Sequence, residues 1–458
     1  MTTMKWKLGQ GLFAVGAFCV AMLIGGEAEA CHDVEICVVL EVDAVDNDTG
    51  NLGVISQVEA AGARVRLVTP DAEGARDTYL NANGCFTAKT RHTRGLKLLV
   101  YPDSYVGVEG AIRIVTFANK VKELADEQKP WLVHLPDVPL DGLEGPVSIG
   151  GEIANMHGWV LAIFKSVDQH AGLLGEAELR VHGEAGETPR RQALGAFATD
   201  LHMMLGPLAR ERKFIIAHEF GHWYQQNWTD DTISTNYGYE DDTDVSEGID
   251  DPSHAKDPDC DFANAVDTTQ INDLHGIRSA EFSAPAMAEG YAHFVAALAF
   301  NDVYMTAPPP QFEYYKDIIV ENQPSYDDLV NEDNYQIDLI GGAASSGGAI
   351  RWTQDMCPAD WNTPINDPDL LGRQVSTEID WLRMFWGFVA DPDPSLALSS
   401  SLPEFLTIMQ IFEASGLGGD DIYLGFQNNL DDPANAEIFP YRTRFADVAV
   451  KNGVQTND

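Results

Sequence analysis

The sequence is poor in basic residues. Its 458 residues hold 29 Lys and Arg against 71 Asp and Glu, which gives a formal net charge of −42 at pH 7. Nucleic acids and anionic membranes would repel such a chain, so we expect neither as a partner. The acidic excess is typical of a solvated surface on a secreted protein. Structural calcium in acidic loops is the alternative, although no loop has the ligand spacing of an EF-hand.

Cysteine and long apolar runs are also scarce. The chain has 6 cysteines and no CxxC pair, which argues against a zinc-thiolate cluster. Beyond the N-terminus no segment has the roughly 20 apolar residues that a transmembrane helix needs. The glycine-rich run 341–348 lacks the lysine of a phosphate-binding loop. The hydrophobic content is that of a folded globular protein, since 45% of the residues are hydrophobic.

The N-terminus predicts export. MTTMKWKLGQ carries Lys5 and Lys7 and no acid, the apolar run GLFAVGAFCVAMLIGG follows, and Ala28-Glu29-Ala30 forms a small-x-small cleavage pattern. We therefore expect residues 1–30 to be a signal peptide cut after Ala30, and the protein to be secreted or periplasmic. Cys31 follows the cut, but no large aliphatic residue precedes it as in a lipobox, so we do not expect a lipoprotein.

An exported chain meets oxidising conditions, which favour disulfides. Cleavage after Ala30 leaves five cysteines, an odd number: Cys31, Cys37, Cys85, Cys260 and Cys357. We expect Cys37 to pair with Cys85 and Cys260 to pair with Cys357. The connectivity does not follow from sequence alone.

The N-terminal region predicts β structure. Between residues 34 and 118, apolar or alternating stretches are separated by turns rich in Gly, Asn and Asp. These stretches are VEICVVLEV, ARVRLVT, GCFTAKT, LKLLVYP and IRIVTFA. Residues 60–90 resemble the small β-sandwich modules of secreted bacterial proteins, in which "T…G.F" leads from one strand into the next. The resemblance implies a spacer or binding domain over 31–120, and Pro-rich residues 121–150 are interpreted as a linker.

The rest of the chain, 151–458, predicts an α+β domain with a largely helical C-terminal part. ELRVHGE and ALGAFATDLHMML are interpreted as strands. Apolar residues recur at helical spacing in several segments. These are GEIANMHGWVLAIFKSVDQH, RERKFIIAHEFGHWYQQNW, SAPAMAEGYAHFVAALAFN, EIDWLRMFWGFVADP and LPEFLTIMQIFEAS.

The segment AHEFGHWYQQ, residues 217–226, contains the candidate metal ligands and the candidate catalytic base. On a helix, His218 and His222 share one face about 6 Å apart in rise, so both can bind one ion. Catalytic zinc uses three protein ligands and a water, and Glu219 beside the first histidine can take a proton from that water. Gly221 lowers helix propensity, but its missing side chain allows another segment to approach closely.

A third ligand has to come from elsewhere in the chain. Glu289, in AMAEGYAHF, lies on the next strongly predicted helix. Taken alone, Glu289 is better explained as an acid stabilised by the helix N-terminus. Together with HEFGH, it is our candidate for the third ligand.

HEFGH followed by a helical Glu resembles the gluzincins, the thermolysin-like zinc peptidases. The resemblance covers about residues 150–320 and implies a zincin-like domain, in which His218, His222 and Glu289 bind one Zn²⁺ and Glu219 is the catalytic base. In that family an edge strand that receives the substrate backbone precedes the metal helix, as ALGAFAT does here. SAEFSAPAMAEGYAHF also resembles a group of secreted bacterial proteins with the pattern "S.E…A..EG.AHF".

One position departs from the family pattern. Thermolysin-like enzymes often carry an Asp four residues after the third ligand, and it orients a ligand histidine; here that position is His293. His293 is open to four interpretations: a partner of a ligand, a donor to the substrate, an alternative ligand, or a histidine packed beside the site.

A peptidase also needs a group that stabilises the oxyanion. The sequence does not choose among the candidates, which are His275, Tyr237, Tyr239, Tyr291 and Arg383. We expect Asp380 and Arg383 to pair with each other on a helix. Glu281 is expected to fix the approach of the Glu289 helix.

These patterns predict an exported zinc peptidase that hydrolyses peptide bonds with a zinc-activated water and Glu219 as general base. The first alternative is a protein of the cell envelope that uses zinc only for structure or binding, although such a site would not require Glu219. A second alternative makes the β module the functional part, binding a surface polymer. The substrate, endo- or exopeptidase action and the oligomeric state stay open.

Overall fold

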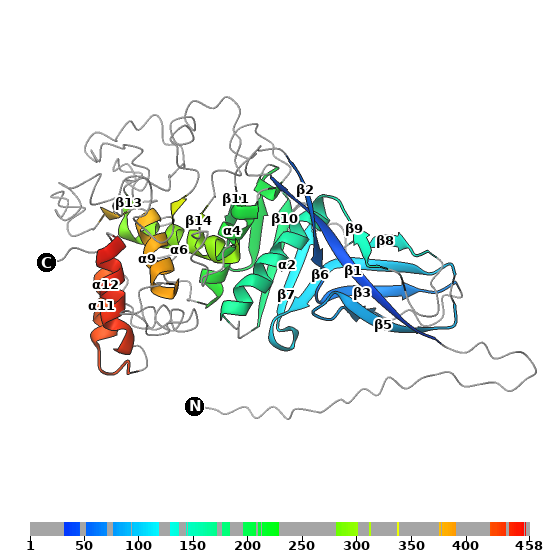
Figure 1. Ribbon diagram of the computed structural model, residues 1–458, viewed down its shortest axis with the longest axis horizontal. Helices are drawn as coiled ribbons and strands as arrows, with labels where there is room; N and C mark the ends of the chain where they lie inside the picture. Colours follow the sequence, from blue (N-terminus) through cyan, green and yellow to red (C-terminus); the bar gives the residue numbers. More distant parts are fainter. Residues whose placement is uncertain are drawn as a thin grey trace, which may run out of the picture.

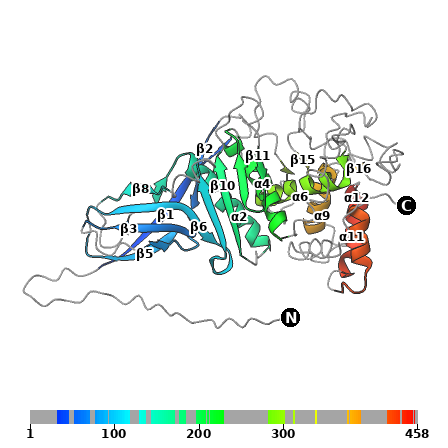
Figure 2. The same cartoon turned by 180° about the vertical axis from the view of Figure 1, so that it is seen from behind.

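The computed structural model describes a mixed α+β protein with strands at one end and helices at the other (Figures 1 and 2). The described residues are 32–45, 52–70, 77–92, 94–118, 129–136, 143, 145–171, 176–183, 196–207, 209–211, 213–228, 281–300, 311–312, 337–338, 375–376, 378–390, 422–436, 439–452 and 454.

The strands are β1 His32–Val45, β2 Leu52–Glu59, β3 Ala63–Val68, β4 Asp77–Tyr79, β5 Cys85–Thr90, β6 Lys97–Val106, β7 Ile112–Phe117, β8 Trp131–His134, β9 Val147–Ile149, β10 Ala177–Gly183, β11 Ala196–Ala198, β12 His202–Leu205, β13 Glu281–Phe282, β14 Gln311–Phe312, β15 Ile337–Asp338 and β16 Val375–Ser376. The helices are α2 Glu152–Ala171, α4 Lys213–Trp228, α6 Ser283–Phe300, α9 Glu378–Ala390, α11 Ile422–Asp431 and α12 Arg442–Asn452. Short 3₁₀ turns are η1 Val108–Gly110, η2 Ala209–Glu211 and η7 Phe439–Tyr441.

Most described strands belong to two sheets. The larger has eight strands in the order β11-β12-β10-β7-β6-β3-β4, with β8 paired to β6; the smaller has the order β2-β1-β5, with β9 paired to β1. Strands β1, β3, β5, β6, β7, β10, β11 and β12 lie where the sequence predicts strands. β4, β8 and β9 were not predicted because three or four residues give no readable alternation.

The larger sheet contains strands from the predicted N-terminal β region and strands from the predicted α+β domain. β7 pairs in parallel with β10, although residues 118–176, which include the predicted linker 121–150, separate them in sequence. β8 and β9, within that same stretch, pair with β6 and β1. The buried side chains of both sheets and of the helices belong to one hydrophobic cluster. The strand-rich end therefore supports the helical end directly.

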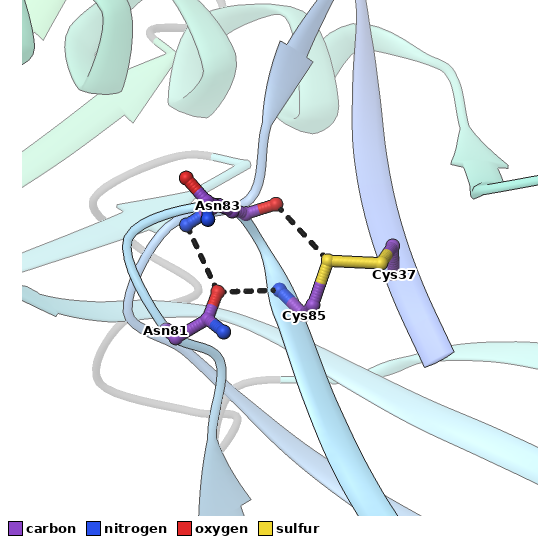
Figure 3. The surroundings of a disulfide bond; sticks show 4 residues. All are labelled: Cys37, Asn81, Asn83 and Cys85. Carbon is purple, nitrogen blue, oxygen red and sulfur yellow. Dashed lines mark hydrogen bonds between the residues drawn. A yellow bond between two sulfur atoms is a disulfide. The ribbon is translucent and has the colours of Figure 1, made fainter. Parts of the chain in front are cut away.

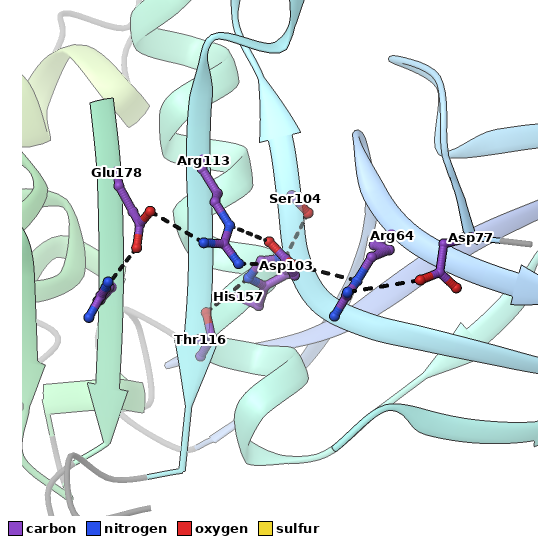
Figure 4. Close-up of polar contacts among 9 residues, drawn as sticks. Arg64, Asp77, Asp103, Ser104, Arg113, Thr116, His157 and Glu178 are labelled. Atoms are coloured by element: carbon purple, nitrogen blue, oxygen red, sulfur yellow. Dashed lines mark hydrogen bonds and ion pairs between the residues drawn. The ribbon is translucent and has the colours of Figure 1, made fainter. Parts of the chain in front are cut away.

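Helix α2 is pinned to one face of the larger sheet through a buried histidine (Figure 4). His157 is fully buried, its Nε2 lies 2.9 Å from Ser104 Oγ, and its Nδ1 lies 2.9 Å from Thr116 Oγ1. Burial lowers the pKa of His157 to about 3, so the ring is neutral at physiological pH. These contacts satisfy both ring nitrogens inside the core.

The opposite face of this sheet carries a row of ion pairs (Figure 4). Asp103 precedes Ser104 on β6 and so points the other way. Its carboxylate, 3% exposed, accepts from Arg113 Nε at 2.9 Å and Nη2 at 3.3 Å. Arg113 also reaches Glu178 on β10, and Arg64 lies 3.5 Å from Asp103. Charge pairing therefore links β3, β6, β7 and β10 in register.

The predicted disulfide between Cys37 and Cys85 is confirmed (Figure 3). The two cysteines lie directly opposite each other where β1 pairs with β5. Asn81 Oδ1 accepts the backbone N–H groups of Asn83 and Cys85, which shapes the turn that leads into β5. Cys31, Cys260 and Cys357 lie outside the described residues.

The helical end has an aromatic core. Trp381 and Phe385 of α9 pack against rings of α11 and α6, and Phe445 of α12 contacts Phe426 of α11. α9 lies where the sequence predicts a helix, whereas α11 and α12 were not predicted, and the helix predicted over 402–415 lies outside the described residues. Among the described helices, none is both long enough and apolar enough to cross a membrane.

Candidate metal centre

Helix α4 carries HEFGH and is buried on nearly every side. Phe214, Ile216, Phe220 and Trp223 are each at most 2% exposed, so packing holds the helix despite its central glycine. Trp223 Nε1 donates to the carbonyl of Glu178 on β10. One turn further along α4, Asn227 Nδ2 donates to the carbonyl of Asp200, just after β11, at 2.8 Å. The histidines therefore lie on a helix bonded to the larger sheet, near β11, the last strand of that sheet among the described residues.

Helix α6 crosses α4 at Gly221. A Cβ atom added to Gly221 would lie 2.7 Å from Ala292 Cα and 2.9 Å from the Ala292 carbonyl oxygen. The expected close approach of a second segment is therefore confirmed, and that segment is α6. Gly221 adjoins His222, and Ala292 lies one turn after Glu289. The crossing thus brings the histidines and the glutamate together.

Three side chains converge where the helices cross. Glu289 Oε2 lies 3.0 Å from His218 Nε2 and 3.1 Å from His222 Nε2, and the two Nε2 atoms are 3.1 Å apart. Ligands of a tetrahedral zinc ion with bonds of about 2.0–2.1 Å are about 3.3 Å apart. The triangle of two imidazole nitrogens and one carboxylate oxygen differs from that spacing by a few tenths of an ångström. His218, His222 and Glu289 thus fit a divalent metal in both donor type and separation.

The environment of the three residues favours neutral imidazole. The side chains of His218 and Glu289 are 6% and 10% exposed, while His222 is the most open at 18%. Burial, together with His293 and His222, lowers the pKa of His218 to about 3 despite the opposing effect of Glu289. A neutral ring presents the nitrogen lone pair that a metal ion requires.

Glu219 is almost completely buried beside this group. It follows His218 on α4 and is 5% exposed. A carboxylate in such a place is costly to bury without a chemical or hydrogen-bonding role. Its position next to a ligand suits a group that exchanges a proton with a bound water.

His293 lies behind His218. Its Nδ1 is 3.0 Å from His218 Nδ1, the ring centroids are 4.3 Å apart, and the residue is 2% exposed. The contact is to the ring nitrogen opposite the one that faces Glu289. Of the interpretations open for His293, this position supports a partner of a ligand.

The other candidate residues lie in the helical core or outside the described residues. Tyr291 is fully buried and its ring contacts Phe385 on α9. Asp380 and Arg383 of α9 are both buried. His275, Tyr237 and Tyr239 lie outside the described residues.

The start of α6 is fixed by a contact that the sequence does not reveal. Glu281 pairs with Ser376 where β13 meets β16, so the segment before α6 is tied to the segment before α9. The backbone of Glu281 thus takes part in a strand pairing directly before α6. Two-residue strands leave no periodic signal, which is why this link could not be predicted.

Comparison of the chain with family models, with curated proteins and with solved structures finds no match.

Proposed function

We propose that the chain is an exported zinc-dependent peptidase whose active site is built on a zincin-like arrangement of α4 and α6. The convergence of His218 Nε2, His222 Nε2 and Glu289 Oε2 within 3.1 Å of one another carries the proposal. Two histidines and one glutamate form a donor set of catalytic zinc sites, which leave a further position open for water or substrate.

Zinc bound there would supply a Lewis acid that acidifies water and polarises a peptide carbonyl. Glu219 supplies the proton transfers. It accepts a proton from the attacking water as the new C–O bond forms, and returns a proton to the leaving amine as the C–N bond breaks. Its protonation state is restored at the end of the cycle, so no further acid or base is required.

The position of β11 in the larger sheet is the argument for a peptide as the substrate. β11 is the last strand in the order of the larger sheet as described, and its Phe197 is 50% exposed. An extended peptide can add to such an edge through main-chain hydrogen bonds, while exposed side chains provide selectivity. The C-terminal end of α4 is bonded to this region through Gln226 and Asn227, so a peptide on β11 would lie near the metal helix.

The experiment compares the mature protein with Glu219→Gln and with Glu59→Gln, a surface control that removes a carboxylate paired to Lys165. Zinc content is measured for all three, and each is incubated with a mixed peptide library. We expect equal zinc content, and cleavage reduced about 10²–10⁴-fold in Glu219→Gln alone. Equal cleavage by wild type and Glu219→Gln would eliminate the proposed base. Stoichiometric zinc with no cleavage by wild type would indicate a structural metal.

A further inference from the structure

The face of the larger sheet that points away from α2 carries two exposed tyrosines. Ser104 on β6 contacts His157 of α2, so its neighbours Asp103 and Tyr105 point to the opposite face. Tyr79 on β4 is 48% exposed and Tyr105 is 36% exposed, and their ring centroids lie 5.1 Å apart at an angle of 71°. A single exposed apolar side chain needs no explanation, whereas adjacent ones on one face indicate an interaction site.

Arginines stand beside both rings (Figure 4). Arg64 lies directly opposite Tyr79 where β3 pairs with β4. Arg113 lies directly opposite Tyr105 where β6 pairs with β7, and its guanidinium carbon is 5.7 Å from the Tyr105 ring centroid. Buried Asp103 contacts both arginines. These ion pairs fix the guanidinium groups beside the rings before a ligand arrives, which lowers the entropic cost of binding.

Further ion pairs extend this surface across neighbouring strands. Arg66 on β3 pairs with Asp77 on β4 at 2.6 Å. Glu178 on β10 accepts from Arg113 at 3.3 Å and from Arg180 at 2.7 Å. These five side chains are each between 28% and 38% exposed. Because arginine offers only hydrogen-bond donors and a carboxylate only acceptors, the surface presents ordered donors and acceptors side by side.

We propose that the tyrosine face, which is the outward side of β3, β4, β6, β7 and β10 around Tyr79 and Tyr105, binds an extended chain of neutral sugars. A sugar ring has an apolar C–H face that can stack on an aromatic ring, and hydroxyl groups that both donate and accept hydrogen bonds. The tyrosine rings provide the first kind of contact and the guanidinium–carboxylate pairs provide the second. The five strands are consecutive in the sheet and span about 20 Å, which suits a polymer better than a single sugar.

The charge of the tyrosine face favours a neutral ligand over an anionic one. Each of these arginines is paired with a carboxylate: Arg64, Arg66, Arg113 and Arg180. An anionic polymer would therefore meet arginines whose charge is already compensated, on a chain with a formal net charge of −42. A protein partner fits less well, because the core of a protein interface is depleted in charged residues, whereas ion pairs border both rings here.

The experiment is affinity electrophoresis of the mature protein in native gels that contain hydroxyethylcellulose or galactomannan, two neutral polysaccharides. A gel with alginate provides the anionic comparison. Tyr79→Ser/Tyr105→Ser removes both rings, whereas Tyr79→Phe/Tyr105→Phe keeps the rings and removes only the hydroxyl groups. Leu132→Ser on β8 is the control, since Leu132 is a large apolar side chain of the same sheet, 53% exposed, that has no ring. Circular dichroism checks the folding of each variant.

We expect at least one neutral polysaccharide to retard the wild-type protein. Loss of one stacked ring is expected to weaken binding about two- to tenfold, so the double Ser variant should bind about 4–100-fold more weakly. The double Phe variant and Leu132→Ser are expected to bind within about twofold of wild type, because the stacking surface is retained in both.

The other outcomes would overturn the proposal. Unchanged mobility of wild type in both neutral gels would exclude a neutral glycan, and equal retardation of wild type and the double Ser variant would place the sugar elsewhere. Retardation by alginate alone would mean an anionic ligand. Self-association of wild type in sedimentation that the double Ser variant loses, without retardation in the neutral gels, would mean a protein interface. None of these outcomes depends on zinc, so sugar binding and the peptidase function are tested separately.

Discussion

Gly221 of α4 lies against the backbone of Ala292 of α6, so close that a Cβ atom at Gly221 would be 2.7 Å from Ala292 Cα. This contact determines how near the two histidines of α4 come to Glu289. It also explains a glycine in the middle of a buried helix, where it costs about 1 kcal/mol in propensity relative to alanine.

Gly221→Ala should therefore weaken both folding and the metal site. The added methyl group would force the helices apart, and overpacking of this kind costs about 1–3 kcal/mol, against a gain in helix propensity of about 1 kcal/mol. A clash with backbone atoms lies toward the upper end of that cost, so we expect a net destabilisation of up to about 2 kcal/mol in urea unfolding, together with a lower zinc affinity. Gly145→Ala is the control, since a Cβ atom there meets nothing within 4 Å. Unchanged stability and affinity in Gly221→Ala would contradict the close crossing.

If the proposed metal centre binds zinc, removal of the zinc should lower the stability of the native protein. A ligand that binds only the folded state at about 1,000 times its dissociation constant stabilises it by about 4 kcal/mol. We expect EDTA to lower the urea midpoint of wild type, and the midpoint of Glu289→Gln to respond weakly to either zinc or EDTA. A wild-type midpoint independent of both would count against metal binding by His218, His222 and Glu289.

Breaking the ion-pair row on the larger sheet should destabilise the protein without affecting the metal. Among the described residues, Arg113→Met leaves buried Asp103 with the more distant Arg64, and the loss is expected to be about 2 kcal/mol because Arg113 is itself 34% exposed. Arg66→Met is the matched control, since its partner Asp77 is partly exposed and a much smaller change is expected. Urea unfolding measures the loss of stability in both variants. Equal losses would contradict the view that the burial of Asp103 makes its ion pair with Arg113 the more important one.

His157 should make stability fall in mild acid. Burial lowers its pKa in the folded state to about 3, from about 6.5 in an unfolded chain, so between these values the unfolded chain binds the extra proton. The contribution of His157 is complete above about pH 6.5 and is lost progressively as the pH falls toward 3. Between these pH values, the contribution of His157 to the slope of the free energy of unfolding against pH approaches about 1.4 kcal/mol per pH unit.

The measurement is the free energy of unfolding at several pH values for wild type and His157→Gln. His157→Gln keeps an amide that can bond to the hydroxyls of Ser104 and Thr116 but does not titrate. We expect its pH dependence between 6.5 and 4 to be shallower than that of wild type by up to one proton. Parallel curves for the two proteins would show that His157 does not titrate in this way.

Strong local signals in the sequence identified particular elements correctly. Eighteen residues of helical spacing gave α6, and the alternation in ARVRLVT and IRIVTFA gave β3 and β7, because these patterns depend only on neighbouring residues. The pairing of Cys37 with Cys85 was also predicted correctly. The pairing of β7 with β10 and the contact of β13 with β16 were not predictable, since each joins segments that carry no mutual signal.

The candidate site divides in the same way. The sequence by itself determined which groups can bind a metal, because His218 and His222 share a helix face by covalent spacing and Glu219 must lie beside them. Only the tertiary structure decided that Glu289 meets both histidines and that His293 contacts His218, because these distances depend on how α6 crosses α4. That crossing is set by the space at Gly221, which is a property of two helices packed together and of neither one alone.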